Sequence, residues 1–232
     1  NIDYRTPKTL KNNRVEYEFL KGLNADLAIV CAYGQIIPEN FLNLTKKGFV
    51  NIHASILPSW RGAAPIQRSI MNLDPETGIS IMKIKKELDS GPVSNIYKIK
   101  IDQNQNAQEI SEKLSALAAE KILDNVDDIL EDKAKFIDQD HSKATYAKKI
   151  DKEESRIDWD EDASKIIGKI NGLFPSPGAS FSFNGERYKI LKAEIGNGIG
   201  QVGEIISNQL EVACNKNQSI KILEIQRQGK RP

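Results

Sequence analysis

Short apolar runs separated by turn residues dominate the first half of the chain. Residues 27–32, 49–53 and 78–84 are each nearly continuous in apolar side chains, which is typical of buried parallel strands. Residues 15–23 carry apolar side chains at helical spacing, and residues 63–72 predict a short helix between the second and third strands. This order of strand, helix and strand predicts an open α/β sheet.

The middle of the chain changes from a helical pattern to a polar one. Residues 107–130 place their apolar side chains on a single stripe, which predicts a long amphipathic helix. Residues 131–162 are polar and mixed in charge, with only isolated apolar side chains. We therefore expect a linker that runs over the surface after the first domain closes.

After residue 162 the pattern is that of a short helix followed by alternating strands. Residues 163–170 predict the helix, and the Asn184-Gly185 turn predicts a β-hairpin between two alternating segments. The spacing of the strands predicts a small antiparallel barrel. Its expected strands are residues 180–183, 188–191, 201–206, 210–213 and 220–225.

Composition narrows the class of protein. With 39% hydrophobic and 28% charged residues, the chain resembles an ordinary globular protein, and no segment approaches the roughly 20 apolar residues that span a bilayer. We expect no membrane role. Cys31 and Cys214 lie far apart, so neither a disulfide framework nor a cysteine metal site is predicted, which fits the reducing cytoplasm.

Charge is distributed unevenly along the chain. The net charge is +1, but residues 163–232 hold ten Lys or Arg and five Asp or Glu, a balance of +5 that leaves −4 for the rest. Such a tail could contact the phosphates of RNA, or it could be no more than a solvated surface.

Two polar side chains lie together at the end of the second predicted strand. Alternate residues of a strand share a face, so Asn51 and His53 should point the same way. Open α/β sheets bind their ligands at such strand ends. The alternative is that both side chains only hydrogen-bond nearby backbone.

A carboxylate follows the third predicted strand, in the segment Leu88-Asp89-Ser90-Gly91-Pro92. Asp89 could orient an imidazole, or it could only cap the turn that Gly-Pro enforces. The other histidine, His141, lies in the polar segment, where we expect it to be solvated. His53 is therefore the candidate acid or base. Metal and serine-hydrolase chemistry are disfavoured, because no zinc-spaced cluster, phosphate loop or Gly-x-Ser-x-Gly elbow is present.

Several motifs together resemble the 10-formyltetrahydrofolate-dependent formyltransferases. The resemblance runs nearly end to end and is best to the members that act on methionyl-tRNA. Its most specific segments are Asn51-Ile52-His53, Ser55-Ile56-Leu57-Pro58, Arg61-Gly62-Ala63-Ala64-Pro65-Ile66-Gln67 and Leu88-Asp89-Ser90-Gly91-Pro92. Further agreement lies at residues 24–27, 32–35, 76–78, 155–159 and 228–231.

The resemblance implies a Rossmann-like catalytic domain joined to a small barrel that resembles an OB fold. On this sequence we expect the catalytic domain at residues 1–135, a linker at residues 136–158, and the barrel, with tRNA contacts, at residues 159–232. Family members begin with a further strand carrying Gly-Thr-Pro and a basic loop, and neither precedes Asn1. We therefore expect the catalytic domain to lack its first strands.

The resemblance also implies direct transfer of formyl from 10-formyltetrahydrofolate to an amine, without a metal. Asn51 would donate a hydrogen bond to the formyl oxygen, His53 would stabilise the same charge and assist proton transfer, and Asp89 would hold the imidazole. The backbone of four residues would line the folate site, with apolar contacts from residues 33–37. These four are Ser55, Ile56, Leu57 and Pro58. Ile56 and Ser90 are small departures from the family pattern.

The expected acceptor is the amine of methionyl initiator tRNA, in a monomeric cytoplasmic enzyme. One alternative keeps the chemistry and takes a nucleotide-linked amino sugar as the acceptor. Another is a chain that binds folate or RNA without turnover. A formate-releasing hydrolase is disfavoured, because such enzymes add a regulatory domain for which this chain has no room.

Overall fold

The structure, a computed structural model, describes residues 3–230 and divides into two compact units. Unit 1 contains the chain up to Ala63, Gly78–Lys98 and Ser115–Tyr146. Unit 2 contains Ala64–Thr77, Ile99–Leu114 and the chain from Ala147. Each unit is therefore assembled from segments that lie far apart in the sequence. Arg231, which belongs to one of the family segments, lies outside the described residues.

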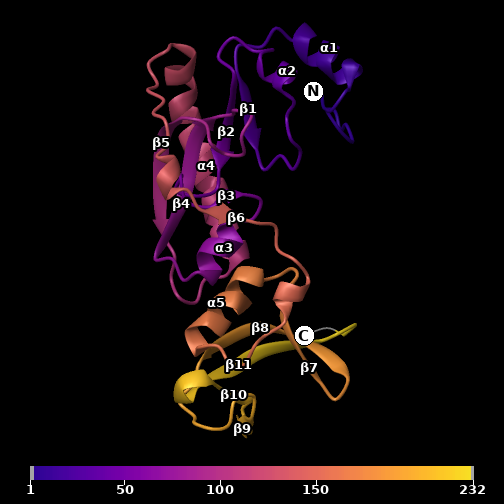
Figure 1. The fold of residues 1–232 in the computed structure, drawn as a ribbon, viewed down its shortest axis with the longest axis vertical. Helices are drawn as coiled ribbons and strands as arrows, with labels where there is room; N and C mark the ends of the chain where they lie inside the picture. The colour runs from indigo at the N-terminus through magenta and orange to yellow at the C-terminus, as the bar shows by residue number, and fades with distance from the viewer. Residues whose placement is uncertain (1–2, 231–232) are drawn as a thin grey trace. The chain divides into compact units, whose positions relative to one another are not determined.

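A four-stranded sheet organises the first half of the chain (Figure 1). Its order is β1 (Ala28–Cys31), β2 (Phe49–His53), β4 (Glu76–Lys83) and β5 (Val93–Lys100). The three strands expected from the apolar runs are confirmed. β1 and β2 are parallel, but β2 and β4 are antiparallel, so the expectation of a parallel third strand is wrong. β4 therefore begins beside the carboxyl end of β2.

Helix α4 (Ala107–Leu130) has the bounds expected from its apolar stripe. Ile129 of α4 packs with Val50 of β2 and Ile81 of β4 in one buried cluster. Because side chains alternate along a strand, α4 covers the face of β2 that carries Val50. Asn51 and His53 therefore lie on the opposite face. The other helices of this half are α1 (Arg14–Gly22), α2 (Glu39–Leu42) and α3 (Pro65–Met71).

The polar segment that follows α4 does not run only over the surface, so that expectation is wrong in part. Gln139, Ala147 and Ser155 are buried. The segment contains the short helical turns η1 (His141–Lys143) and η2 (Glu153–Ser155), and strand β6 (Tyr146–Ala147). β6 pairs with β3 (Arg61–Gly62), and the amide of Arg61 donates to the carbonyl of Thr145. The polar composition of this segment gave no indication that some of its residues are buried.

An antiparallel sheet with one helix forms the C-terminal part of the chain. The sheet order is β7, β8, β11, β10, β9, and the pairs described within it are antiparallel, as expected. Among the described residues the two edge strands, β7 and β9, do not pair, so a closed barrel is not found. The elements are α5 (Ala163–Leu173), β7 (Ala179–Phe183), β8 (Glu186–Ile195), β9 (Ile205–Ser207), β10 (Glu211–Cys214), η3 (Asn215–Asn217) and β11 (Gln218–Arg227).

Helix α5 packs its apolar side on this sheet. Ile166 and Ile170 are buried in one cluster with Ile190 and Ile220 of the strands. Within residues 3–230, no helix is long and apolar enough to cross a membrane.

Candidate functional site

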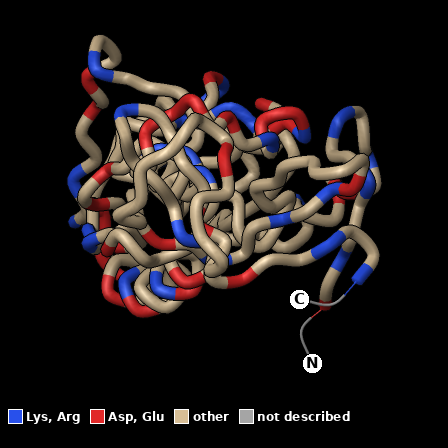
Figure 2. Tube along the Cα trace, turned by 90° about the horizontal axis from the view of Figure 1, so that it is seen from below, with Lys and Arg blue, Asp and Glu red and all other residues tan. Residues whose placement is uncertain are grey.

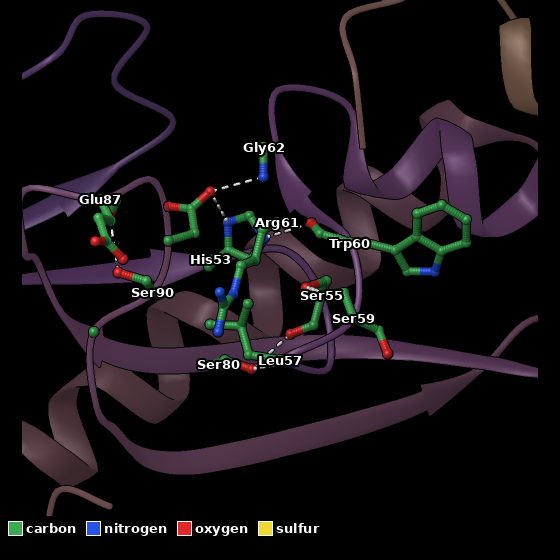
Figure 3. A network of polar contacts seen from close by, with 12 residues as sticks. His53, Ser55, Leu57, Ser59, Trp60, Arg61, Gly62, Ser80, Glu87 and Ser90 are labelled. Atoms are coloured by element: carbon green, nitrogen blue, oxygen red, sulfur yellow. Dashed lines mark hydrogen bonds and ion pairs between the residues drawn. The ribbon is translucent and has the colours of Figure 1, made fainter. Parts of the chain in front are cut away.

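His53 ends strand β2 and is buried, with only 6% of its side chain exposed. Its Nε2 atom lies 2.9 Å from the carbonyl oxygen of Trp60 (Figure 3). A carbonyl oxygen can only accept a hydrogen bond, so Nε2 carries a proton. Nδ1 is therefore the ring nitrogen that can take up or release a proton during a reaction.

Asp89 faces this second ring nitrogen. Its Oδ2 atom lies 3.6 Å from Nδ1 of His53 and accepts a hydrogen bond of 2.8 Å from the amide of Gly62. The carboxylate is 15% exposed. A separation of 3.6 Å is longer than a direct hydrogen bond, although catalytic contacts often tighten only when substrate binds. The structure thus brings together the imidazole and the carboxylate that the sequence suggested.

The backbone at Asp89 explains how the carboxylate reaches His53. Asp89 lies in the connection between β4 and β5, and its φ of 47° is in the left-handed region. Non-glycine residues rarely adopt this conformation, and they keep it when surrounding contacts enforce it. Because β2 and β4 are antiparallel, their carboxyl ends lie at opposite edges of the sheet. The meeting of His53 and Asp89 therefore depends on a folded loop, not on adjacent ends of parallel strands.

Asn51 lies two residues before His53 in the same strand. The pairing of Asn51 with Val30 of β1 and Met82 of β4 places it in the interior of the sheet. Its side chain is half-buried, on the face opposite α4. The carboxamide thus stays accessible on the surface that also holds His53.

The loop after β2 is fixed by hydrogen bonds from within unit 1. The hydroxyl of Ser80 donates to the carbonyl of Ser55, 2.7 Å away, and accepts from the amide of Leu57 at 3.1 Å. The hydroxyl of Ser55 donates to the carbonyl of Ser59 at 2.6 Å, and the carbonyl of Pro58 accepts from the amide of Thr145. The predicted folate-lining segment is therefore held in one shape, with Ile56 half-buried at its centre. Its role toward folate stays a prediction.

Two further residues next to the site had no assigned role in the sequence. Arg61 is only 2% exposed, and Gln139 is 8% exposed. The guanidinium of Arg61 donates from Nε and Nη2 to the Oε1 atom of Gln139, over 3.1 and 2.7 Å. The Nε2 atom of Gln139 donates to the carbonyls of Asp89 and Gly91, over 2.9 and 2.7 Å. The only signal for Arg61 was its place in a family motif, and for Gln139 there was none.

Among the described residues, the other histidine and the two cysteines do not form a second reactive cluster. His141 is exposed, as expected, although its Nδ1 atom lies 3.3 Å from both terminal nitrogens of Arg61. Burial raises the pKa of the Cys214 thiol to about 11, which keeps it protonated and unreactive near neutral pH. Cys31 is a free, exposed cysteine.

The basic residues of the C-terminal sheet are partly paired with acids. Lys221 lies 4.0 Å from Glu194, and Arg227 contacts Glu186. Figure 2 shows Lys and Arg positions interspersed with Asp and Glu positions along the trace. The excess of basic residues in this part of the chain is therefore only partly neutralised by its own carboxylates.

Sequence comparison finds a family for most of the chain. The family described as Formyl transferase matches residues 4–126, and that described as Formyl transferase, C-terminal domain, matches residues 149–232. A methionyl-tRNA formyltransferase of Pelagibacter ubique is 66% identical over all 232 residues, which cover 75% of that protein. One of Dictyoglomus turgidum is 42% identical, with 97% of this chain and 74% of the relative covered.

Solved structures with the same fold are more distant in sequence. HypX from Aquifex aeolicus, in complex with tetrahydrofolic acid, has a TM-score of 0.74 at 18% identity over 96% of this chain and 39% of its own. WlaRD, a sugar 3N-formyl transferase with dTDP and 5-N-formyl-THF, has a TM-score of 0.72 at 21% identity, over 91% and 77%. At these identities the likeness supports the fold alone: a Rossmann-like domain followed by a domain with an antiparallel sheet.

Proposed function

The chain belongs to the formyl transferase family, within its methionyl-tRNA formyltransferases, and from this premise we propose that it formylates methionyl initiator tRNA with 10-formyltetrahydrofolate as donor. The observation that carries this proposal is the facing pair of His53 and Asp89, with Asn51 on the same strand as His53. Transfer of a formyl group from one nitrogen atom to another needs a hydrogen-bond donor for the formyl oxygen and groups that move a proton. A carboxamide, an imidazole and a carboxylate meet these needs.

Asn51 stabilises the charge that develops during transfer. When the methionyl nitrogen bonds to the formyl carbon, the carbonyl oxygen becomes an oxyanion, and the Asn51 carboxamide donates a hydrogen bond to it. A donor that is already oriented in a partly dry site needs little rearrangement as the charge appears. Asn51 is half-buried, and the pairing of β2 on both sides fixes its backbone in the interior of the sheet.

His53 and Asp89 handle the proton. Transfer forms a bond from the amine nitrogen to the formyl carbon and breaks the bond from that carbon to N10, while one proton leaves the amine and N10 gains one. His53 keeps its Nε2 proton on the carbonyl of Trp60, so exchange takes place at Nδ1. Asp89 accepts from Nδ1 when the ring is protonated, which stabilises the imidazolium and holds the ring in place.

The residues after β2 are suited to hold the donor. We place the folate against the backbone of Ser55, Ile56, Leu57 and Pro58, which the hydroxyl of Ser80 and the amide of Thr145 keep in a fixed shape. The loop of residues 33–37 exposes Tyr33 and Ile36, by 41% and 86%, and these side chains offer apolar contacts to a pterin ring.

The C-terminal part of the chain serves tRNA binding in this proposal. We divide the chain into a catalytic domain at residues 1–135, a linker at residues 136–158 and an OB-like domain at residues 159–232. Five antiparallel strands and a small excess of basic residues, ten Lys or Arg against eight Asp or Glu in residues 159–232, support this assignment. We further propose that the enzyme is a cytoplasmic monomer.

Transfer of labelled formyl from 10-formyltetrahydrofolate tests the proposal directly, with methionyl initiator tRNA and a nucleotide-linked amino sugar as competing acceptors. We expect label on the tRNA, with affinity that falls steeply between about 50 and 200 mM salt, because lysines and arginines that bind phosphate release counterions. Label on the sugar, or tRNA binding that is indifferent to salt, would show that the acceptor has been misassigned.

A further inference from the structure

Arg61 and Gln139 form a buried pair beside Asp89, with no carboxylate as counter-ion. Guanidinium groups stay charged in proteins, and burial of a charge is costly unless hydrogen bonds or an opposite charge compensate it. Within residues 3–230, no ion pair joins Arg61 to an Asp or Glu, and its guanidinium makes its hydrogen bonds with Gln139 and His141. A side chain that only filled space here could be apolar at lower cost.

The amide of Gln139 is used completely. Its oxygen accepts two hydrogen bonds from Arg61, and its nitrogen donates two, to the carbonyls of Asp89 and Gly91. A carboxamide has two acceptor lone pairs and two donor hydrogens, so no capacity is left. The orientation is also fixed, because a flipped amide would set its donors against the donors of Arg61.

The same two-residue strand holds Asp89 from two directions. Gly62 of β3 donates its backbone amide to the Asp89 carboxylate, at 2.8 Å. Arg61, the residue before it, reaches the carbonyls of Asp89 and Gly91 through Gln139. These contacts enclose a residue whose backbone is in the left-handed region, and they hold it there.

We propose that Arg61 and Gln139 are positioning residues for formyl transfer: they fix the backbone at Asp89 so that its carboxylate faces Nδ1 of His53. Neither residue needs to touch the substrates. The inference rests on the proposed function, because it assumes that Asp89 acts with His53 in the reaction.

Gln139→Glu is the sharpest test, because it keeps the shape and both acceptor sites toward Arg61 but replaces the two donors with oxygen. Two carbonyls then face a carboxylate, and the loop at Asp89 must move. We expect kcat for formylation of methionyl-tRNA to fall about 10- to 100-fold, the scale for a misplacement of about 1 Å. We expect KM for both substrates to stay within about threefold, because the displaced group acts on the transition state.

Gln108→Glu is the matched control. It makes the same chemical change at an exposed position of α4, so this variant should retain the parental kcat. Rates are normalised to the folded fraction measured by circular dichroism. If Gln139→Glu does not fold, Gln139→Met, which is of similar length and uncharged, replaces it and should show the same fall in kcat. An unchanged kcat in a folded Gln139 variant, or failure of both variants to fold, would overturn the proposal. A parental enzyme without formyl transfer would instead refute the proposed function.

Discussion

Replacing Asn51 with alanine is expected to lower kcat for formylation of methionyl-tRNA by about 10² to 10³-fold, the usual cost of one oxyanion donor. The carboxamide lies on the interior strand β2, on the face that also holds His53. Its hydrogen bond strengthens as the formyl oxygen gains charge, so the loss should appear in kcat, with KM for the donor changed by no more than about threefold.

Steady-state kinetics with 10-formyltetrahydrofolate and methionyl-tRNA measures this effect. Asn40→Ala is a suitable control, because Asn40 is exposed on α2 and should give parental kinetics. If Asn51→Ala raised KM and left kcat unchanged, the carboxamide would bind the ground state and would not be an oxyanion donor.

Replacing Gly91 with alanine is expected to damage both stability and catalysis. A Cβ atom at Gly91 would lie 1.8 Å from the carbonyl oxygen of Lys83, a backbone atom of β4 that cannot rotate away. The loop must therefore shift by more than 1 Å, by comparison with ordinary contact distances of about 3.5 Å. Because Gly91 is two residues from Asp89 and shares the Gln139 amide with it, this shift should displace the carboxylate.

We expect the melting temperature of Gly91→Ala to fall by several degrees, since such overpacking costs about 1 to 3 kcal/mol or more. In the folded protein, kcat should fall about 100-fold. Gly22→Ala is the matched control: a Cβ there meets no atom within 4 Å, and Gly22 ends a helix. Equal melting temperatures and equal kcat values for the two variants would show that the loop at Asp89 yields without cost.

Local patterns in the sequence predicted where helices and strands lie better than they predicted the direction in which a strand runs. The bounds of α4 follow from an apolar stripe that repeats over many turns, and the hairpin of β7 and β8 follows from the Asn184-Gly185 turn. The antiparallel direction of β4 was missed, because apolar content reports that a strand is buried but not which way it runs. β5 was missed because none of its residues is buried and its apolar residues do not follow a strict alternation.

The site could be predicted only where short-range patterns carry it. Asn51 and His53 share a strand, so their common face follows from the alternation of side chains. That Asp89 would face His53 required a family motif, because the loop between β4 and β5 folds back in a way that composition does not reveal. Gln139 lies 50 residues from Asp89 in a polar segment, where nothing local distinguishes a buried amide from a solvated one.

The most direct test of the central claim is a double-mutant cycle on single-turnover formyl transfer to methionyl-tRNA, with His53→Gln, Asp89→Asn and the two combined. Asp89→Asn removes the charge but keeps an oxygen that can accept from Gly62. If imidazole and carboxylate act as one proton-handling unit, each single change should slow transfer by about 10² to 10⁴-fold, and the double variant should be about as slow as the slower single one. Losses that multiply, or a parental rate in Asp89→Asn, would contradict the account.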